Sequence, residues 1–159
     1  MQIPDWFKRH ILPDSWEKPA HEKENGKRIL VVDDKAHIRR LIEVNLSRQG
    51  YCVDIADSGD DALDALLSDN YSLFILGSSL PDLSFSDMLS ALKADMDTQN
   101  IPVICLLADR QEVNTFNMWR SGIDCFLTKP FNPMELIAFT RRIFRDLEDM
   151  RGEPFYTSV

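Results

Sequence analysis

The sequence lacks both the long hydrophobic run of a membrane protein and the cysteine spacing of a metal or redox module. No stretch approaches the roughly 18 apolar residues that a membrane-spanning helix needs. The cysteines, Cys52, Cys105 and Cys125, are far apart, and each lies within or beside an apolar run. We therefore expect buried, reduced thiols in a cytoplasmic protein that does not enter a membrane.

An excess of positive charge is also missing. The chain has 18 basic and 26 acidic residues, which gives a net charge of −8. Basic residues cluster at Arg141, Arg142 and Arg145, but acidic Asp146, Glu148 and Asp149 interleave with them at helical spacing. Such mixing is typical of a solvated helix face. Nucleic acid is thus not expected as a partner.

The sequence has no glycine-rich turn after its first apolar run and no recognisable set of catalytic residues. The first apolar run leads directly into Asp33, Asp34 and Lys35, so it is not followed by a dinucleotide or P-loop phosphate cradle. The adjacent aspartates also differ from the Asp-x-Asp spacing of haloacid dehalogenase phosphatases. No Ser/His/Asp set stands out, because the histidines are scattered at positions 10, 21 and 37. We expect that the protein is not an enzyme.

The organisation of the 159 residues indicates one domain with short extensions, and 44% hydrophobic residues suffice for one core. Residues 1–27 form an N-terminal extension and linker, residues 28–148 the domain, and residues 149–159 a tail. The extension is apolar in its first half and mostly charged from Lys18 to Lys27. Its apolar residues either pack on the following domain or dock another protein: Ile3, Trp6, Phe7, Ile11, Leu12 and Trp16. We expect no separate output domain.

From Arg28 onward, short apolar runs alternate with amphipathic stretches. The runs predict five strands, at residues 29–32, 51–56, 73–76, 103–107 and 125–128, and helical stripes follow them, including one at residues 113–119. Strands that are each followed by a helix indicate parallel pairing through crossovers, and nearly uninterrupted apolar strands suit a sheet covered on both faces. The predicted fold is a doubly wound, five-stranded parallel α/β sheet with helices on both faces.

Ligand sites in such sheets lie at the carboxyl ends of the strands. Asp33 and Asp34 follow the first strand directly, and two adjacent carboxylates there need a cation or hydrogen-bond donors nearby. Mg²⁺ would serve, and so would Lys129, which follows the fifth strand. A helix N-cap would explain one of the two aspartates but not easily both.

Three sequence blocks resemble the receiver domain of bacterial response regulators: Val31–Asp34, Ile101–Ile104 and Gly122–Phe131. The resemblance covers about residues 28 to 148. It implies the flavodoxin-like strand order 2-1-3-4-5, and a bond between Lys129 and Pro130 that is often cis in the family.

The resemblance also assigns roles to single positions. Asp33 and Asp34 match the family's Mg²⁺-binding pair, Lys129 the lysine that pairs with the phosphoryl group, and Phe126 the aromatic switch residue. Two positions depart from the pattern: Gly77 stands where the family has its phospho-accepting aspartate, and Leu107 where it has a hydroxyl residue. Phe85 also stands where a loop glycine is usual.

These departures predict a pseudo-receiver, meaning a receiver fold that binds a partner without being phosphorylated. No cofactor is required, and Mg²⁺ should bind weakly at most to two carboxylates. We expect Leu107 to fill the volume that Gly77 leaves. The resemblance implies a partner on the face of the fourth helix, fifth strand and fifth helix, and leaves open whether a histidine kinase acts on the chain. Two alternatives are phosphorylation at Ser78, Ser79 or Asp82, and a scaffold whose Trp-rich N-terminus docks a partner.

Overall fold

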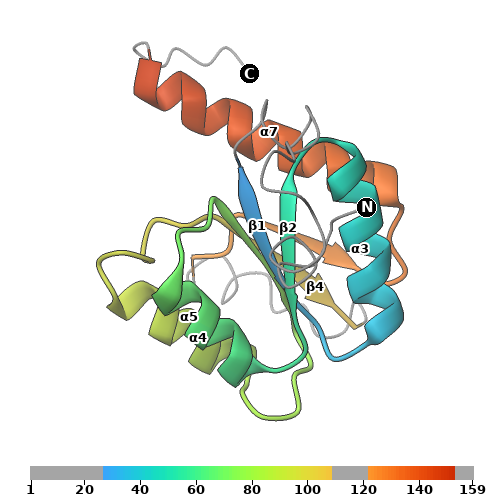
Figure 1. The fold of residues 1–159 in the computed structure, drawn as a ribbon, viewed down its shortest axis with the longest axis vertical. Helices are drawn as coiled ribbons and strands as arrows, with labels where there is room; N and C mark the ends of the chain where they lie inside the picture. Colours follow the sequence, from blue (N-terminus) through green and yellow to red (C-terminus); the bar gives the residue numbers. More distant parts are fainter. Residues whose placement is uncertain (1–26, 109–121, 153–159) are drawn as a thin grey trace, which may run out of the picture.

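The computed structural model describes residues 27–108 and 122–152. The N-terminal extension before Lys27 and the expected helix at residues 113–119 lie outside the described residues. The described part contains five strands that form one parallel sheet of order β2-β1-β3-β4-β5 (Figure 1): β1 Arg28–Val32, β2 Cys52–Ala56, β3 Leu73–Gly77, β4 Val103–Leu107 and β5 Cys125–Thr128. This confirms the predicted fold class and strand order.

Four described helices cover the sheet on both faces: α3 Ala36–Arg48, α4 Gly59–Ser68, α5 Phe85–Ala94 and α7 Pro133–Gly152. α3 and α7 lie against one face, and α4 and α5 against the other (Figure 1). α7 extends to Gly152, so residues 149–152, which the sequence placed in a tail, are helical. No helix among the described residues is long and apolar enough to span a membrane.

The strands bury side chains on both faces because successive residues point to opposite sides. On β1, Leu30 and Val32 join the core under α4 and α5, while Ile29 and Val31 join the core under α3 and α7. Every residue of β3 and β4 is buried. The apolar runs in the sequence are therefore central strands of a covered sheet.

The helices on the α4 and α5 side begin at serine caps. The Ser58 side chain accepts a hydrogen bond from the Asp61 backbone N–H, and the Ser84 side chain accepts one from Asp87. Each cap satisfies a backbone donor that the first helical turn leaves without a partner. The caps define where α4 and α5 begin. They therefore help to position the loops that connect β2 and β3 to these helices.

Candidate functional site

Asp33 lies at the carboxyl end of β1 and is fully buried. Its Oδ2 is 2.6 Å from Nζ of Lys129, and its Oδ1 accepts a hydrogen bond of 2.9 Å from the Lys35 backbone N–H. Burial of a carboxylate is tolerated only when such partners replace the lost hydration. Both oxygens of Asp33 are therefore engaged within the protein.

Lys129 reaches Asp33 from the end of β5. Its backbone N–H donates to the carbonyl of Leu107 at 2.8 Å, and the peptide bond to Pro130 is cis. The side chain is 17% exposed, so the ammonium group keeps limited contact with solvent. The structure thus brings together the two predicted residues Asp33 and Lys129, which are 96 positions apart.

Gly77 ends β3, and the space next to it is already occupied. A Cβ atom placed on this glycine would lie 2.5 Å from Oδ2 and 3.1 Å from Cγ of Asp33. Real Cβ atoms essentially never approach other atoms so closely. The Asp33 carboxylate therefore lies where a side chain at position 77 would begin, and the glycine makes the observed ion pair sterically possible.

The expectation that Leu107 fills the space left by Gly77 is wrong. Leu107 is fully buried in the core under α4 and α5, together with Leu76 on the neighbouring strand. Gly77 follows Leu76 and so faces the opposite side of the sheet. The two positions lie on different faces, and Asp33 occupies the space instead. Phe126, half-buried on β5, packs against the same core as Leu107.

Asp34 is not part of the buried pair. Its carboxylate is 3.5 Å from the ammonium group of Lys35, whose side chain is 60% exposed. No group of three or more metal-ligating side chains occurs in the described residues. With both Asp33 oxygens engaged and one further carboxylate nearby, the donor set does not fit Mg²⁺ without breaking the bond to Lys129.

Among the residues that follow β3, Ser78 and Asp82 accept hydrogen bonds through their side chains, whereas Ser79 is held through its backbone. The Ser78 Oγ accepts a hydrogen bond of 3.3 Å from the Ala108 backbone N–H, and Ser79 forms an isolated antiparallel bridge with Ser84. Asp82 accepts two bonds of 2.9 Å, from the backbone N–H groups of Gly59 and Asp60.

Asp82 therefore caps α4 from another loop. Hydrogen bonds from the Gly59 and Asp60 amides hold the pKa of its carboxyl below the usual range. A negative charge at a helix N-terminus is also favoured by the helix dipole. Sequence reasoning did not find this cap, because its two halves are 22 residues apart and follow no local motif.

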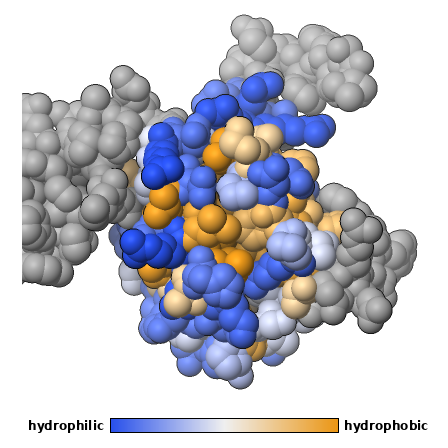
Figure 2. Space-filling model, turned by 90° about the vertical axis from the view of Figure 1, so that its right-hand side faces the viewer, coloured by the Kyte–Doolittle hydropathy of each residue, from blue (hydrophilic) through white to orange (hydrophobic). Residues whose placement is uncertain are grey.

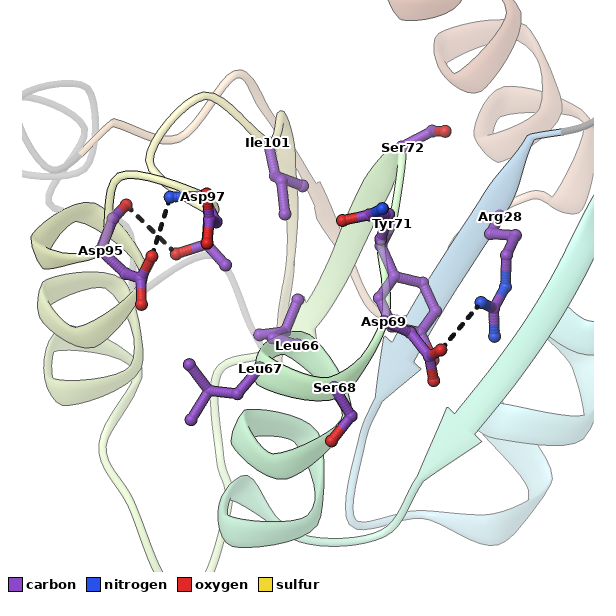
Figure 3. A pocket seen from close by; sticks show the side chains of 12 residues that line it. Arg28, Leu66, Leu67, Ser68, Asp69, Tyr71, Ser72, Asp95, Asp97 and Ile101 are labelled. Atoms are coloured by element: carbon purple, nitrogen blue, oxygen red, sulfur yellow. Dashed lines mark hydrogen bonds and ion pairs between the residues drawn. The ribbon is translucent and has the colours of Figure 1, made fainter.

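A second polar cluster that the sequence did not indicate lies at the opposite end of the sheet. Arg28 pairs with Asp54 at 2.6 Å and with Asp69 at 3.4 Å, and the Tyr71 hydroxyl donates to Asp54 at 2.7 Å. Burial and the bond to Asp54 raise the pKa of Tyr71. Arg28, Asp69 and Tyr71 help line an open pocket of about 520 Å³ (Figure 3). It belongs to the amino end of the strands and is separate from Asp33 and Lys129.

Known proteins with similar sequences and structures agree on the family. The model of the response regulator receiver domain matches residues 29–141. The transcriptional regulatory proteins ResD of Bacillus subtilis and SrrA of Staphylococcus aureus are 33% and 31% identical over 124 and 117 residues. These matches cover 78% and 74% of this chain but 50% and 47% of the relatives, so the chain spans about half their length.

Solved structures give the same result. The response regulator TrrA of Thermotoga maritima is 32% identical with a TM-score of 0.66, and the receiver domain of the Francisella response regulator 1452 is 29% identical with a TM-score of 0.70. The matches cover 74% and 76% of this chain and 98% of each structure. The sheet order, the buried pair at the strand ends and these similarities together show that the chain belongs to the response regulator receiver domain family of two-component signalling.

Proposed function

We propose that this receiver acts as a pseudo-receiver, which binds a protein partner without phosphorylation and without catalysing a reaction. The observation that carries the proposal is the position of Asp33. Its carboxylate covers Gly77 and forms an ion pair with Lys129. This lysine is the residue that would otherwise pair with an incoming phosphoryl group. A phosphodonor would meet a glycine with no nucleophilic side chain, beside a lysine that is already neutralised.

Packing at Leu107 supports a single resting conformation. The residue is fully buried among apolar side chains and has no hydroxyl that could turn toward a phosphoryl oxygen. A side chain held in a close-packed core moves only at a cost in free energy. Phe126 packs against the same core. We therefore propose that the domain binds its partner through a surface that is always available, and not through a conformational change driven by phosphorylation.

The proposed output surface includes β5 and α7. A groove of about 500 Å³ runs between them, with Phe126, Phe139 and Ile143 among its lining residues and Arg142 and Asp146 as charged members. Apolar side chains beside charges of both signs suit a protein partner. The expected face also includes the helix predicted at residues 113–119, which is the receiver's fourth helix and not α4. That helix lies outside the described residues. We propose that this protein works in the cytoplasm, where its three cysteines would stay reduced.

The experiment is intact-mass analysis together with amide NMR after addition of Mg²⁺ and a small-molecule phosphodonor. A receiver that has an aspartate at the end of its third strand, treated in parallel, shows that the donor is active. We expect no added phosphoryl mass on this chain and few shifted amides around Gly77. A stable adduct, with shifts that spread from Gly77 to Phe126, would refute the proposal.

Phosphorylation at another residue is the second candidate. The two amides that bind Asp82 hold its carboxylate at the start of α4, which argues against Asp82 as an acceptor. A serine hydroxyl is a weak nucleophile without a base, and Ser78 already accepts a bond from Ala108. If an adduct forms, fragmentation of the modified protein identifies the residue.

A further inference from the structure

An apolar strip with a basic border lies along the contact between α3 and α7. Leu41 and Val44 on α3 are each 36% exposed, and Met134 on α7 is 67% exposed. Figure 2 shows that the side of the molecule formed around α3 carries an apolar area among charged residues. Large apolar side chains gathered on a surface mark an interaction site more often than scattered ones do.

Helical spacing places these residues next to the second helix. Gln49, which follows α3, accepts a hydrogen bond from Arg141 of α7. Leu41 lies two i±4 steps before Gln49 on one ridge of α3, and Met134 lies two turns before Arg141 on the same side of α7. We call the surface made by Leu41, Val44, Met134, Arg48, Arg141 and Arg145 the α3–α7 face. Its three arginines are all exposed and make it basic.

The N-terminal extension enters the domain beside this face. The Lys27 ammonium group lies 5.1 Å from the centre of the Phe144 ring of α7 and 3.6 Å from Glu148. The Lys27 carbonyl accepts a bond from Cys52, close to the loop that follows α3. The residues before Lys27 therefore start from the end of the α3–α7 contact, and Lys27 neutralises the acidic side chain of Glu148 there.

Residues 1–17 place acidic side chains beside both tryptophans, while the two basic residues, Lys8 and Arg9, lie between the tryptophans. Trp6 directly follows Asp5, and Trp16 lies between Asp14 and Glu17 with one serine intervening. Aromatic side chains beside carboxylates can cover the apolar strip while the carboxylates approach the arginines. A second copy of the domain fits less well, because two α3–α7 faces would set arginine against arginine.

The linker has a suitable length. The nine residues 18–26 are mostly polar, and a flexible chain of nine residues has ends on average about 15 to 18 Å apart. The 13 residues of α3 are about 20 Å long. A linker that matches the span gives an effective concentration on the order of mM, so even a weak docking contact would be largely formed.

We propose that residues 1–17 dock on the α3–α7 face of their own chain. Any protein that uses this face must first displace the segment, which makes the extension a built-in competitor. The contact is partly electrostatic and weakens as the salt concentration rises.

The test is an amide and indole NMR comparison on the full chain. In the double variant Trp6→Ser/Trp16→Ser we expect amide shifts at residues 41–48 and 134–145. In the face variant Leu41→Ser/Met134→Ser, the indole N–H signals of Trp6 and Trp16 should move to their positions in a free peptide of residues 1–17. The matched control is Leu67→Ser on α4, a 69% exposed site on the other side of the sheet, which should leave both indole signals in place.

Three results would overturn the proposal. Indole signals that already match the free peptide in the unaltered chain would mean that the segment does not dock. Indole signals that differ from those of the free peptide but do not change in Leu41→Ser/Met134→Ser would mean that the segment docks on another surface. Signals that approach the free peptide on dilution would mean that the segment binds a second copy. Signals that are unchanged on dilution and sensitive to the face variant support docking within one chain.

Discussion

The buried ion pair makes a quantitative prediction for Lys129→Met. This change leaves the fully buried Asp33 carboxylate with the Lys35 amide but no cation, which costs about 3 to 5 kcal/mol when a buried pair is broken from one side. Because the Lys129 side chain is 17% exposed, we expect the lower end, about 3 kcal/mol. That is a large share of the roughly 5 to 15 kcal/mol that stabilises a typical domain.

Urea unfolding followed by circular dichroism measures this loss. The midpoint should fall while the slope with denaturant stays unchanged, since the surface exposed on unfolding is the same. Replacing both partners, as in Asp33→Leu/Lys129→Met, should recover most of the loss, because it also removes the unpaired charge. The control is Lys35→Met, whose exposed pair with Asp34 is worth about 0 to 1 kcal/mol. A loss below about 1 kcal/mol for Lys129→Met would mean that Asp33 does not depend on Lys129 as its counter-charge.

Three further substitutions and one chemical modification test other parts of the domain. Gly77→Ala forces Asp33 to move, so unfolding experiments should show a loss of about 1 to 3 kcal/mol, and an unchanged midpoint would contradict the proposed close approach. Leu107→Ala opens a cavity in the core and should cost about 2 to 5 kcal/mol in the same assay. Because the pKa of Asp82 is lowered in the folded protein, its stabilising effect is present near neutral pH and is lost as the pH falls below about 4; the stability difference between the unaltered chain and Asp82→Asn should shrink over that range. Burial raises the pKa of Cys125 to about 11, so alkylation followed by mass spectrometry should be slow near neutral pH and accelerate as the pH approaches that value.

Much of the fold could be predicted from the sequence because the apolar runs are central strands. The predicted run at residues 103–107 agrees with β4 as observed, and the run at residues 125–128 agrees with β5. Strand ends elsewhere differ by one residue: β1 begins at Arg28, β2 at Cys52, and β3 ends at Gly77. Those ends depend on hydrogen bonds to neighbouring strands, which a one-dimensional pattern does not contain.

For the site, the sequence predicted the pairing of an acidic residue with Lys129 but not the geometry of the pair. Adjacent carboxylates after a buried strand require a counter-charge, and that requirement led to Lys129. It did not indicate which aspartate pairs, nor that Asp33 would cover Gly77, because both follow from the three-dimensional path of the backbone. Side-chain alternation along β3 and β4 could have shown that Leu107 and Gly77 face opposite sides once the register was known.

The contact between Asp33 and Gly77 bears on how this domain can evolve. Glycine and aspartate codons can differ by one nucleotide, so an aspartate at position 77 is one mutation away. That step would introduce a Cβ 2.5 Å from the Asp33 carboxylate, so Asp33 would have to shift and its pair with Lys129 would be disturbed. Selection would meet this cost before any benefit of a carboxylate at position 77, so the contact between Asp33 and Gly77 disfavours this substitution.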